Sequence, residues 1–130
     1  MPLIDIRLAG PCLPANIERF AARMADLVVD VLHKQRELTA AVVHCVAPHH
    51  WHVGGTAVSA DGRATFCVEA NVTAGTNTAA EKAAFIAAAF AAAEAILGRI
   101  DAASYVIVRE LPADAWGWQG KTQAARRLDG

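Results

Sequence analysis

The sequence predicts a mixed α/β (α+β) fold in which a strand–helix–strand unit occurs twice along the 130 residues. Apolar and polar residues alternate over 3–8 and again over 64–72, as they do in strands with one buried face. Apolar residues recur at spacings of three and four over 17–32, which is the period of an amphipathic helix. A strand, a proline and a tryptophan turn then close each half, at 39–55 and at 103–120.

The first half is expected to form a strand, a helix and a second strand. Pro14 follows a Gly-Pro turn and suits the first turn of a helix. The cations within 33–36 lie where the dipole of that helix favours positive charge, at its C-terminal end. The β-branched run over 39–47 predicts a buried strand, and Pro48 ends it.

The second half repeats this order. Thr78 and Glu81 have the spacing of a capping box, in which each side chain satisfies a free backbone amide of the other residue. An alanine-rich helix is expected to run from there to Gly98, a residue that commonly ends helices. A strand over 103–110 follows, and Pro112 ends it.

The matching halves predict one domain, 1–130, built by duplication from two β-α-β repeats at about 1–60 and 61–130. Two right-handed β-α-β crossovers place four main strands in one sheet with both helices on one face. The other face is then left open. We expect it to carry Ile, Val and Phe side chains that a partner chain covers.

Composition excludes several classes of function. The net charge of −1 leaves no basic surplus for nucleic acid or for a membrane surface. No apolar run reaches the roughly 18 residues of a membrane span, and the alternating N-terminus does not resemble a signal peptide. Cys12, Cys45 and Cys67 are odd in number and include no CxxC pair, which indicates reduced thiols in a cytoplasmic protein.

The N-terminus is the candidate functional feature. An initiator methionine before proline is normally removed, which would leave Pro2 with a free secondary amine. An α-amino group titrates near about pH 8, so a modest pKa depression makes it an acid, base or nucleophile at neutral pH. The strand that begins here would hold the amine in place. The alternative is an ordinary N-terminus without a chemical role.

The segments 1–10 (MPLIDIRLAG) and 106–117 (VIVRELPADAWG) resemble the tautomerase superfamily. The second segment is similar to the end of a 4-oxalocrotonate tautomerase subunit, where a strand and a glutamate precede an aromatic-glycine turn. The doubled length resembles the fused members of the superfamily. It also resembles malonate semialdehyde decarboxylase and cis-3-chloroacrylic acid dehalogenase. The resemblance spans both halves of the chain.

This resemblance implies a β-α-β fold, a homotrimer and Pro2 as the general acid/base of an enol–keto tautomerase, an isomerase that acts on a small 2-oxo or enol acid without a cofactor. Two alternatives remain open. One is a decarboxylase, hydratase or dehalogenase of a three-carbon acid in the same site. The other is a non-catalytic trimer that has kept the fold.

The expected substrate-binding residues surround Pro2. They are Leu3, Thr76, Asn77, Tyr105 and Trp116. By the resemblance, Tyr105 and Trp116 would line the Pro2 pocket of an adjacent subunit. Thr76 and Asn77 are candidate hydrogen-bond donors to a substrate oxygen.

The carboxylate-binding arginines of the superfamily are missing from their aligned positions. Pro11 and Thr76 stand at one pair of these positions, and Val42 and Tyr105 stand at the other. A guanidinium is the usual bidentate clamp for a carboxylate, so its loss favours the non-catalytic alternative. Candidate substitutes elsewhere in the chain are Arg7, Lys34, Arg36, Arg109 and Lys121.

Four histidines raise the question of a metal. They are His44, His49, His50 and His52. Zinc requires three or four ligands in a fixed geometry. Because the sequence lacks a second block of ligands, we expect a solvated turn and no metal site.

Overall fold

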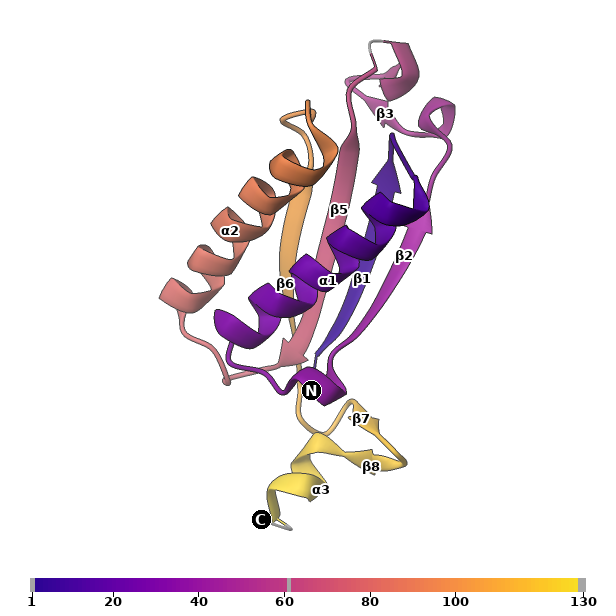
Figure 1. Cartoon of the computed structure of the whole chain (residues 1–130). Coiled ribbons are helices and arrows are strands. Elements are labelled where there is room, and N and C mark those ends of the chain that lie inside the picture. The colour runs from indigo at the N-terminus through magenta and orange to yellow at the C-terminus, as the bar shows by residue number, and fades with distance from the viewer. Residues whose placement is uncertain (1, 61, 129–130) are drawn as a thin grey trace.

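The computed structural model describes residues 2–60 and 62–128, and it shows a four-stranded sheet covered on one face by two helices (Figure 1). The main elements are β1 (Leu3–Ala9), α1 (Pro14–Asp30), β2 (Ala40–Cys45), β5 (Thr65–Thr73), α2 (Ala79–Leu97) and β6 (Tyr105–Leu111). The strand order is β2-β1-β5-β6. β1 and β2 are parallel, β5 and β6 are parallel, and β1 and β5 meet antiparallel at the centre. The predicted fold class is therefore confirmed.

Short elements extend both ends of the sheet. They are η1 (Arg36–Leu38), η2 (Pro48–His50), β3 (His52–Val53), β4 (Thr56–Ala57), η3 (Val58–Ala60), β7 (Gly117–Trp118), β8 (Lys121–Thr122) and α3 (Gln123–Leu128). The β3–β4 and β7–β8 hairpins lie at opposite ends of the molecule, and the N-terminus lies near the second (Figure 1). Across residues 2–60 and 62–128, no helix combines the length and apolarity that a membrane crossing requires.

The core lies between the sheet and the helices. Alternate residues of β1 point into it, so Ile4, Ile6 and Leu8 are fully buried. The aromatic ring of Phe20 from α1 meets Phe66 of β5 edge to face, with 5.9 Å between the ring centroids. Each such large side chain contributes about 1.5–3 kcal/mol by leaving water, which makes this layer the main source of stability.

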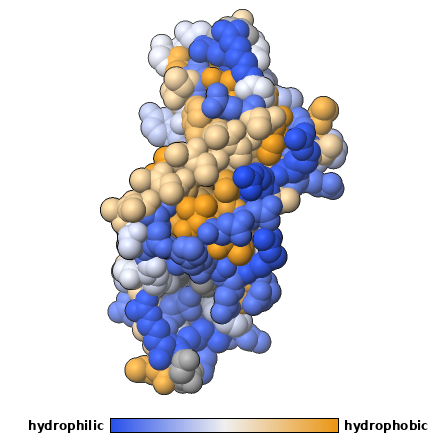
Figure 2. Space-filling model, turned by 60° about the vertical axis from the view of Figure 1, so that its left-hand side comes forward, coloured by the Kyte–Doolittle hydropathy of each residue, from blue (hydrophilic) through white to orange (hydrophobic). Residues whose placement is uncertain are grey.

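Helix α2 has apolar residues on its outer side as well, and Figure 2 shows them as a pale-orange band. The exposed apolar residues of the helix are Ala79, Ala80, Ala83, Ala84, Ile86, Ala87, Ala91 and Ala95. On its inner side, Phe85, Ala89 and Ala93 are fully buried. The small alanines there let α1 and α2 lie close together over the sheet.

The open face of the sheet is more polar than the sequence predicts. Phe66 and Val68 point toward the helices, because they alternate with Cys67 and Glu69 along β5. At the centre of the open face, Asp5 pairs in register with Glu69. The exposed apolar residues of this face are Leu3, Val42, Tyr105 and Ile107. The expected Phe is thus absent from the described open face, while Val and Ile are present near its edges.

Two cysteines form a disulfide that the sequence analysis does not anticipate. Cys12 and Cys45 are joined across 33 positions of sequence, with their Cα atoms 6.3 Å apart. Cys67 is the free cysteine. The expectation of reduced thiols is therefore wrong for Cys12 and Cys45. The crossover from β1 to β2 brings the turn before α1 against the end of β2, a proximity that sequence spacing does not reveal.

Candidate active site

Pro2 is buried immediately before β1, between the start of β2 and the end of β5. Its carbonyl oxygen accepts a hydrogen bond from the amide of Ala40 at 3.3 Å. The next carbonyl, that of Leu3, accepts one from the side-chain amide of Asn71 at 3.0 Å. These bonds fix the start of the chain from both sides. Met1, whose removal we expect, lies outside the described residues.

Trp116 and Tyr105 lie at opposite ends of the sheet within one chain. The indole Nε1 of Trp116 donates to the Thr73 hydroxyl at 3.1 Å, and Thr73 ends β5 beside the start of β1. Trp116 is therefore at the Pro2 end of its own subunit. Tyr105 instead pairs with Cys67, which pairs with Arg7 farther along β1, and its side chain is 62% exposed. A contact between Tyr105 and Pro2 of an adjacent subunit stays a prediction.

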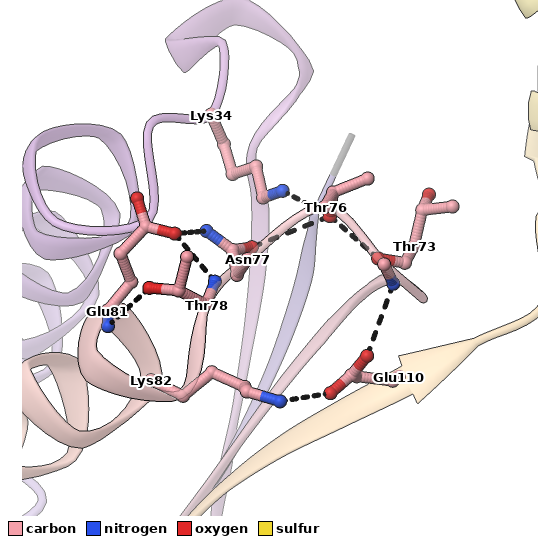
Figure 3. Close-up of polar contacts among 9 residues, drawn as sticks. Lys34, Thr73, Thr76, Asn77, Thr78, Glu81, Lys82 and Glu110 are labelled. Carbon is pink, nitrogen blue, oxygen red and sulfur yellow. Dashed lines mark hydrogen bonds and ion pairs between the residues drawn. The ribbon is translucent and has the colours of Figure 1, made fainter.

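Thr76 and Asn77 lie in the loop between β5 and α2, where they join the end of α1 (Figure 3). The Thr76 hydroxyl donates to the Thr73 carbonyl at 2.6 Å and accepts from the Lys34 ammonium at 2.8 Å. The Asn77 amide donates to the Leu32 carbonyl at 2.9 Å. Both side chains thus have intrachain partners, which gives no support to their expected role as donors to a substrate.

The loop also carries the predicted capping box. Thr78 accepts from the Glu81 amide at 3.1 Å, and the Glu81 carboxylate accepts from the Thr78 amide at 2.8 Å. The bond from the Thr78 amide, aided by Asn77, lowers the pKa of the Glu81 carboxyl. Nearby, Glu110 accepts from Lys82 and from the Gly75 amide, and the hydrogen bond from Lys82 is the main cause of its lowered pKa (Figure 3). Glu110 is therefore a structural acceptor.

A cavity of about 350 Å³ lies at this end of the molecule, between the segment after α1 and the β7–β8–α3 unit. Its lining residues are His33, Lys34, Gln35, Leu38, Trp118, Gln123 and Arg126. Leu38 precedes by two positions the Ala40 amide that binds Pro2. The cavity therefore adjoins the segment that holds Pro2, and two of its lining side chains, Lys34 and Arg126, are basic. We name it the Lys34–Arg126 cavity.

Arg126 is a functional candidate that the sequence pattern does not indicate. Its guanidinium lies 3.6 Å from the centroid of the Trp118 ring and donates to the Trp118 carbonyl at 2.8 Å. In the sequence, Arg126 is marked only by a tryptophan eight positions earlier. The contact between the two residues forms because β7, β8 and α3 fold back on themselves.

The other candidate cations have different surroundings. Arg36 pairs with Asp26 at 2.9 Å, and Arg109 approaches Glu69 at 3.8 Å. Lys121 belongs to β8. Only Lys34 among the five substitutes named from the sequence lines the Lys34–Arg126 cavity.

A second cavity, of about 420 Å³, opens at the far end of the sheet. It is lined by Arg7, Val46, His50, Trp51, His52, Cys67 and Tyr105. Burial raises the pKa of the Cys67 thiol, and the nearby Glu69 adds to this effect. Among the residues that the structure describes, no three His, Cys, Asp or Glu side chains gather as metal ligands. The absence of a metal stays a prediction.

Comparisons with known proteins agree with this geometry. Residues 67–126 match the family model described as tautomerase enzyme. A fused 4-OT wild-type symmetric trimer has 25% identity and a TM-score of 0.82, with 95% of this chain and 98% of that chain covered. Native fused 4-OT has 22% identity and a TM-score of 0.84, with 95% and 97% covered. Pt0534 inactivated by 2-oxo-3-pentynoate has 16% identity and a TM-score of 0.84, with 95% and 98% covered. No curated protein matches the chain.

These matches confirm the resemblance to the tautomerase superfamily. The chain has the fold of the doubled-length members, since the fused 4-OT structures align along 95% of it. A tautomerase-family function is accordingly supported, and trimers occur among its structural relatives.

Proposed function

We propose that this chain is an enol–keto tautomerase in which the amine of Pro2 is the general acid/base for a small 2-oxo or enol acid. The main observation that supports the proposal is the position of Pro2 in the fold. It is buried and fixed by backbone bonds at the end of the sheet where Trp116 and the Lys34–Arg126 cavity also lie. The fused 4-OT fold and the tautomerase family match support the same reaction class.

The proposed chemistry is a proton transfer. Once Met1 is removed, the neutral secondary amine of Pro2 can take the proton of an enol hydroxyl and return a proton to carbon. Burial disfavours the charged form of an amine, so it would lower the pKa of Pro2 from about 8 toward neutrality. A pKa near the working pH suits a group that must both accept and release a proton. No cofactor is needed for this step.

We further propose a cytoplasmic homotrimer in which Leu3 and Trp116 border the Pro2 pocket and Tyr105 reaches it from an adjacent subunit. Exposed Tyr105 and Leu3 on the open sheet face support this arrangement. Trimeric fused 4-OT relatives support the assembly. The substrate is the small-molecule partner.

The non-catalytic trimer is the second candidate. It is favoured by the absence of arginine at the aligned positions, where Pro11, Val42 and Thr76 stand instead. The decarboxylase, hydratase and dehalogenase alternatives require a protonated Pro2, and no described contact favours them over proton transfer.

The deciding experiment replaces Pro2 by alanine. Turnover of phenylenolpyruvate and 2-hydroxymuconate should fall by about two orders of magnitude or more, the usual worth of a placed acid–base group. Pro14→Ala is the matched control, because Pro14 is exposed in the first turn of α1 and outside the proposed site. Its turnover should equal that of the wild type.

Two results would contradict the proposal. Equal turnover of Pro2→Ala and wild type would exclude Pro2 as the acid/base. An intact mass that includes Met1 would make the Pro2 nitrogen an amide without an available lone pair. Either result would favour the non-catalytic trimer.

A further inference from the structure

The Lys34–Arg126 cavity presents positive charge without an acidic residue among its lining side chains. His33, which also lines it, has its Nε2 3.2 Å from the Glu81 carboxylate, and Glu81 itself is not a lining residue. Gln35 and Gln123 add neutral polar groups. Such a lining favours an anion over a cation or a purely apolar ligand.

Arg126 lines this cavity and has one donor without a partner. One terminal nitrogen of its guanidinium donates to the Trp118 carbonyl, and the plane of the group lies over the Trp118 ring. Its Nε atom is buried and has no hydrogen-bond partner among the described residues. A buried donor without a partner costs free energy, more so when the group is charged. The stacking on Trp118 nevertheless holds the guanidinium in a fixed orientation.

The positive charge of Lys34 is also only partly balanced by its neighbours. Its ammonium has three donors, and its hydrogen bond to a described residue goes to the neutral Thr76 hydroxyl at 2.8 Å. Burial lowers the pKa of Lys34, and the attraction of Glu81 offsets this only in part. A bound anion would stabilise the charged ammonium in the same place.

We propose that Arg126 and Lys34 form the carboxylate-binding subsite of this chain, with Arg126 as the oriented guanidinium and Lys34 as the second cation. The ligand class is a small monocarboxylic 2-oxo or enol acid, an assignment that rests on the proposed tautomerase function. The Arg126 guanidinium and Lys34 Nζ donate charge-assisted hydrogen bonds to the carboxylate. Neither Lys34 nor Arg126 occupies a position that aligns with a carboxylate-binding arginine of the superfamily.

The size and position of the cavity fit this role. A volume of about 350 Å³ is at the small end of ligand sites and suits a compact acid. Leu38 connects the cavity wall to the strand start that binds the Pro2 carbonyl. The cavity and the segment that holds Pro2 therefore meet at residues 38–40.

The test is a binding experiment that does not depend on turnover. Pyruvate is titrated into the full chain while the Nε–H resonances of arginine are followed by proton–nitrogen NMR. We expect a saturable shift of the Arg126 Nε–H resonance with pyruvate and none with methyl pyruvate, which lacks the carboxylate. Arg126→Gln should weaken pyruvate binding by about ten- to a hundredfold, the range for losing a charge-assisted bond.

Control variants test whether weaker binding is specific to Arg126 or follows from the loss of any positive charge nearby. Arg127→Gln removes the same charge from the exposed neighbouring position and should bind pyruvate as the wild type does. Arg126→Lys keeps the charge but loses the planar fork, so its affinity should lie between those of wild type and Arg126→Gln. A thermal melt verifies that each variant is folded. If Arg126→Gln is not folded, pyruvate binding is compared between the wild type and Lys34→Gln instead.

The outcomes also separate this subsite from the proposed reaction. Pyruvate binding that persists in Pro2→Ala and weakens in Arg126→Gln supports the subsite, even if the wild type shows no tautomerase turnover. The inference is overturned if wild type gives no saturable shift, if methyl pyruvate binds equally well, or if the folded Arg126 and Lys34 variants bind pyruvate with wild-type affinity.

Discussion

The disulfide between Cys12 and Cys45 fixes the turn before α1 to the end of β2, next to the β3–β4 hairpin. A cross-link of this kind stabilises a fold mainly by restricting the unfolded chain. Disulfides persist in oxidising compartments and are rare in the cytoplasm of mesophiles. The bond therefore bears against the proposed cytoplasmic location, and the oxidation state of the three cysteines is worth measuring directly.

We predict that replacing Cys12 and Cys45 together by serine lowers the free energy of unfolding by about 2–4 kcal/mol, the usual effect of removing a disulfide. Cys67→Ser is the control, since Cys67 is the free cysteine and closes no loop. Denaturant unfolding under non-reducing conditions measures both variants. Alkylation of the unfolded wild type without reductant should label one cysteine, and labelling of all three would show that the disulfide does not form.

Individual residues show where sequence reasoning reaches its limit. Thr78 and Glu81 could be assigned correctly, because their partners lie within a local motif. Thr76 and Asn77 could not, since their hydrogen bonds depend on the end of α1 lying beside their loop. Pro2 could be singled out from the sequence as a candidate, and its role stays a prediction.

Among the helices, α2 begins with the strongest local signal in the chain. The capping box satisfies free amides at its first turn, and an alanine-rich sequence has high intrinsic helix propensity. Because hydrogen bonds from the cap lower the pKa of the Glu81 carboxyl, the folded state binds a proton there less readily than the unfolded state. Stability supplied by ionised Glu81 is therefore present above the ordinary glutamate pKa and is lost as the pH falls through the lowered value.

We predict that Glu81→Gln reduces the loss of stability on acidification between about pH 6 and pH 3, because glutamine keeps the cap geometry but does not titrate. Glu94→Gln is the matched control, as Glu94 lies exposed on the same helix. Thermal unfolding as a function of pH measures the difference. If both variants follow the wild-type acid profile, the Glu81 carboxylate does not contribute to the pH dependence.

Helix α3 shows the opposite case, a helix that local sequence does not announce. It covers Gln123–Leu128, too few residues for a clear apolar period. Thr122 accepts a hydrogen bond from the Ala125 amide at 3.0 Å, and Arg126 anchors the helix to Trp118. Tertiary contacts with the β7–β8 hairpin therefore order this segment, and they turn an apparent polar tail into part of a candidate site.

The whole molecule has an approximate twofold arrangement about the β1–β5 pair. Asp5 and Glu69 lie opposite each other at the centre, with His44 3.8 Å from Asp5 and Arg109 3.8 Å from Glu69. The sequence could predict this arrangement because both halves share the same strand, proline and tryptophan order. It supports the proposed duplication, whose boundary at about residue 60 stays a prediction.

The same symmetry leaves one sheet face without a helical layer in the single chain. Its centre carries charged side chains, and its apolar residues lie toward the β2 and β6 edges, with Val42 and Ile107 in one register row. Interfaces between subunits usually have an apolar centre and a polar rim, so we expect the β2 and β6 edges, and not the charged middle of the face, to form the centre of each subunit contact. Two of the structures that the chain resembles are trimers, and in the proposed trimer of this chain we expect the open face to form the subunit contact.

We predict that the wild type is a trimer at micromolar concentration and that Ile107→Glu dissociates it, because the change would bury an unpaired carboxylate in the interface. Ile86→Glu is the matched control: Ile86 is 40% exposed on α2 and Ile107 is 37% exposed on β6, so only their positions differ. Light scattering during size-exclusion chromatography gives the mass of each species. A monomeric wild type would exclude the trimer, whereas a trimeric Ile107→Glu beside a dissociated Ile86→Glu would move the interface to the outer side of α2.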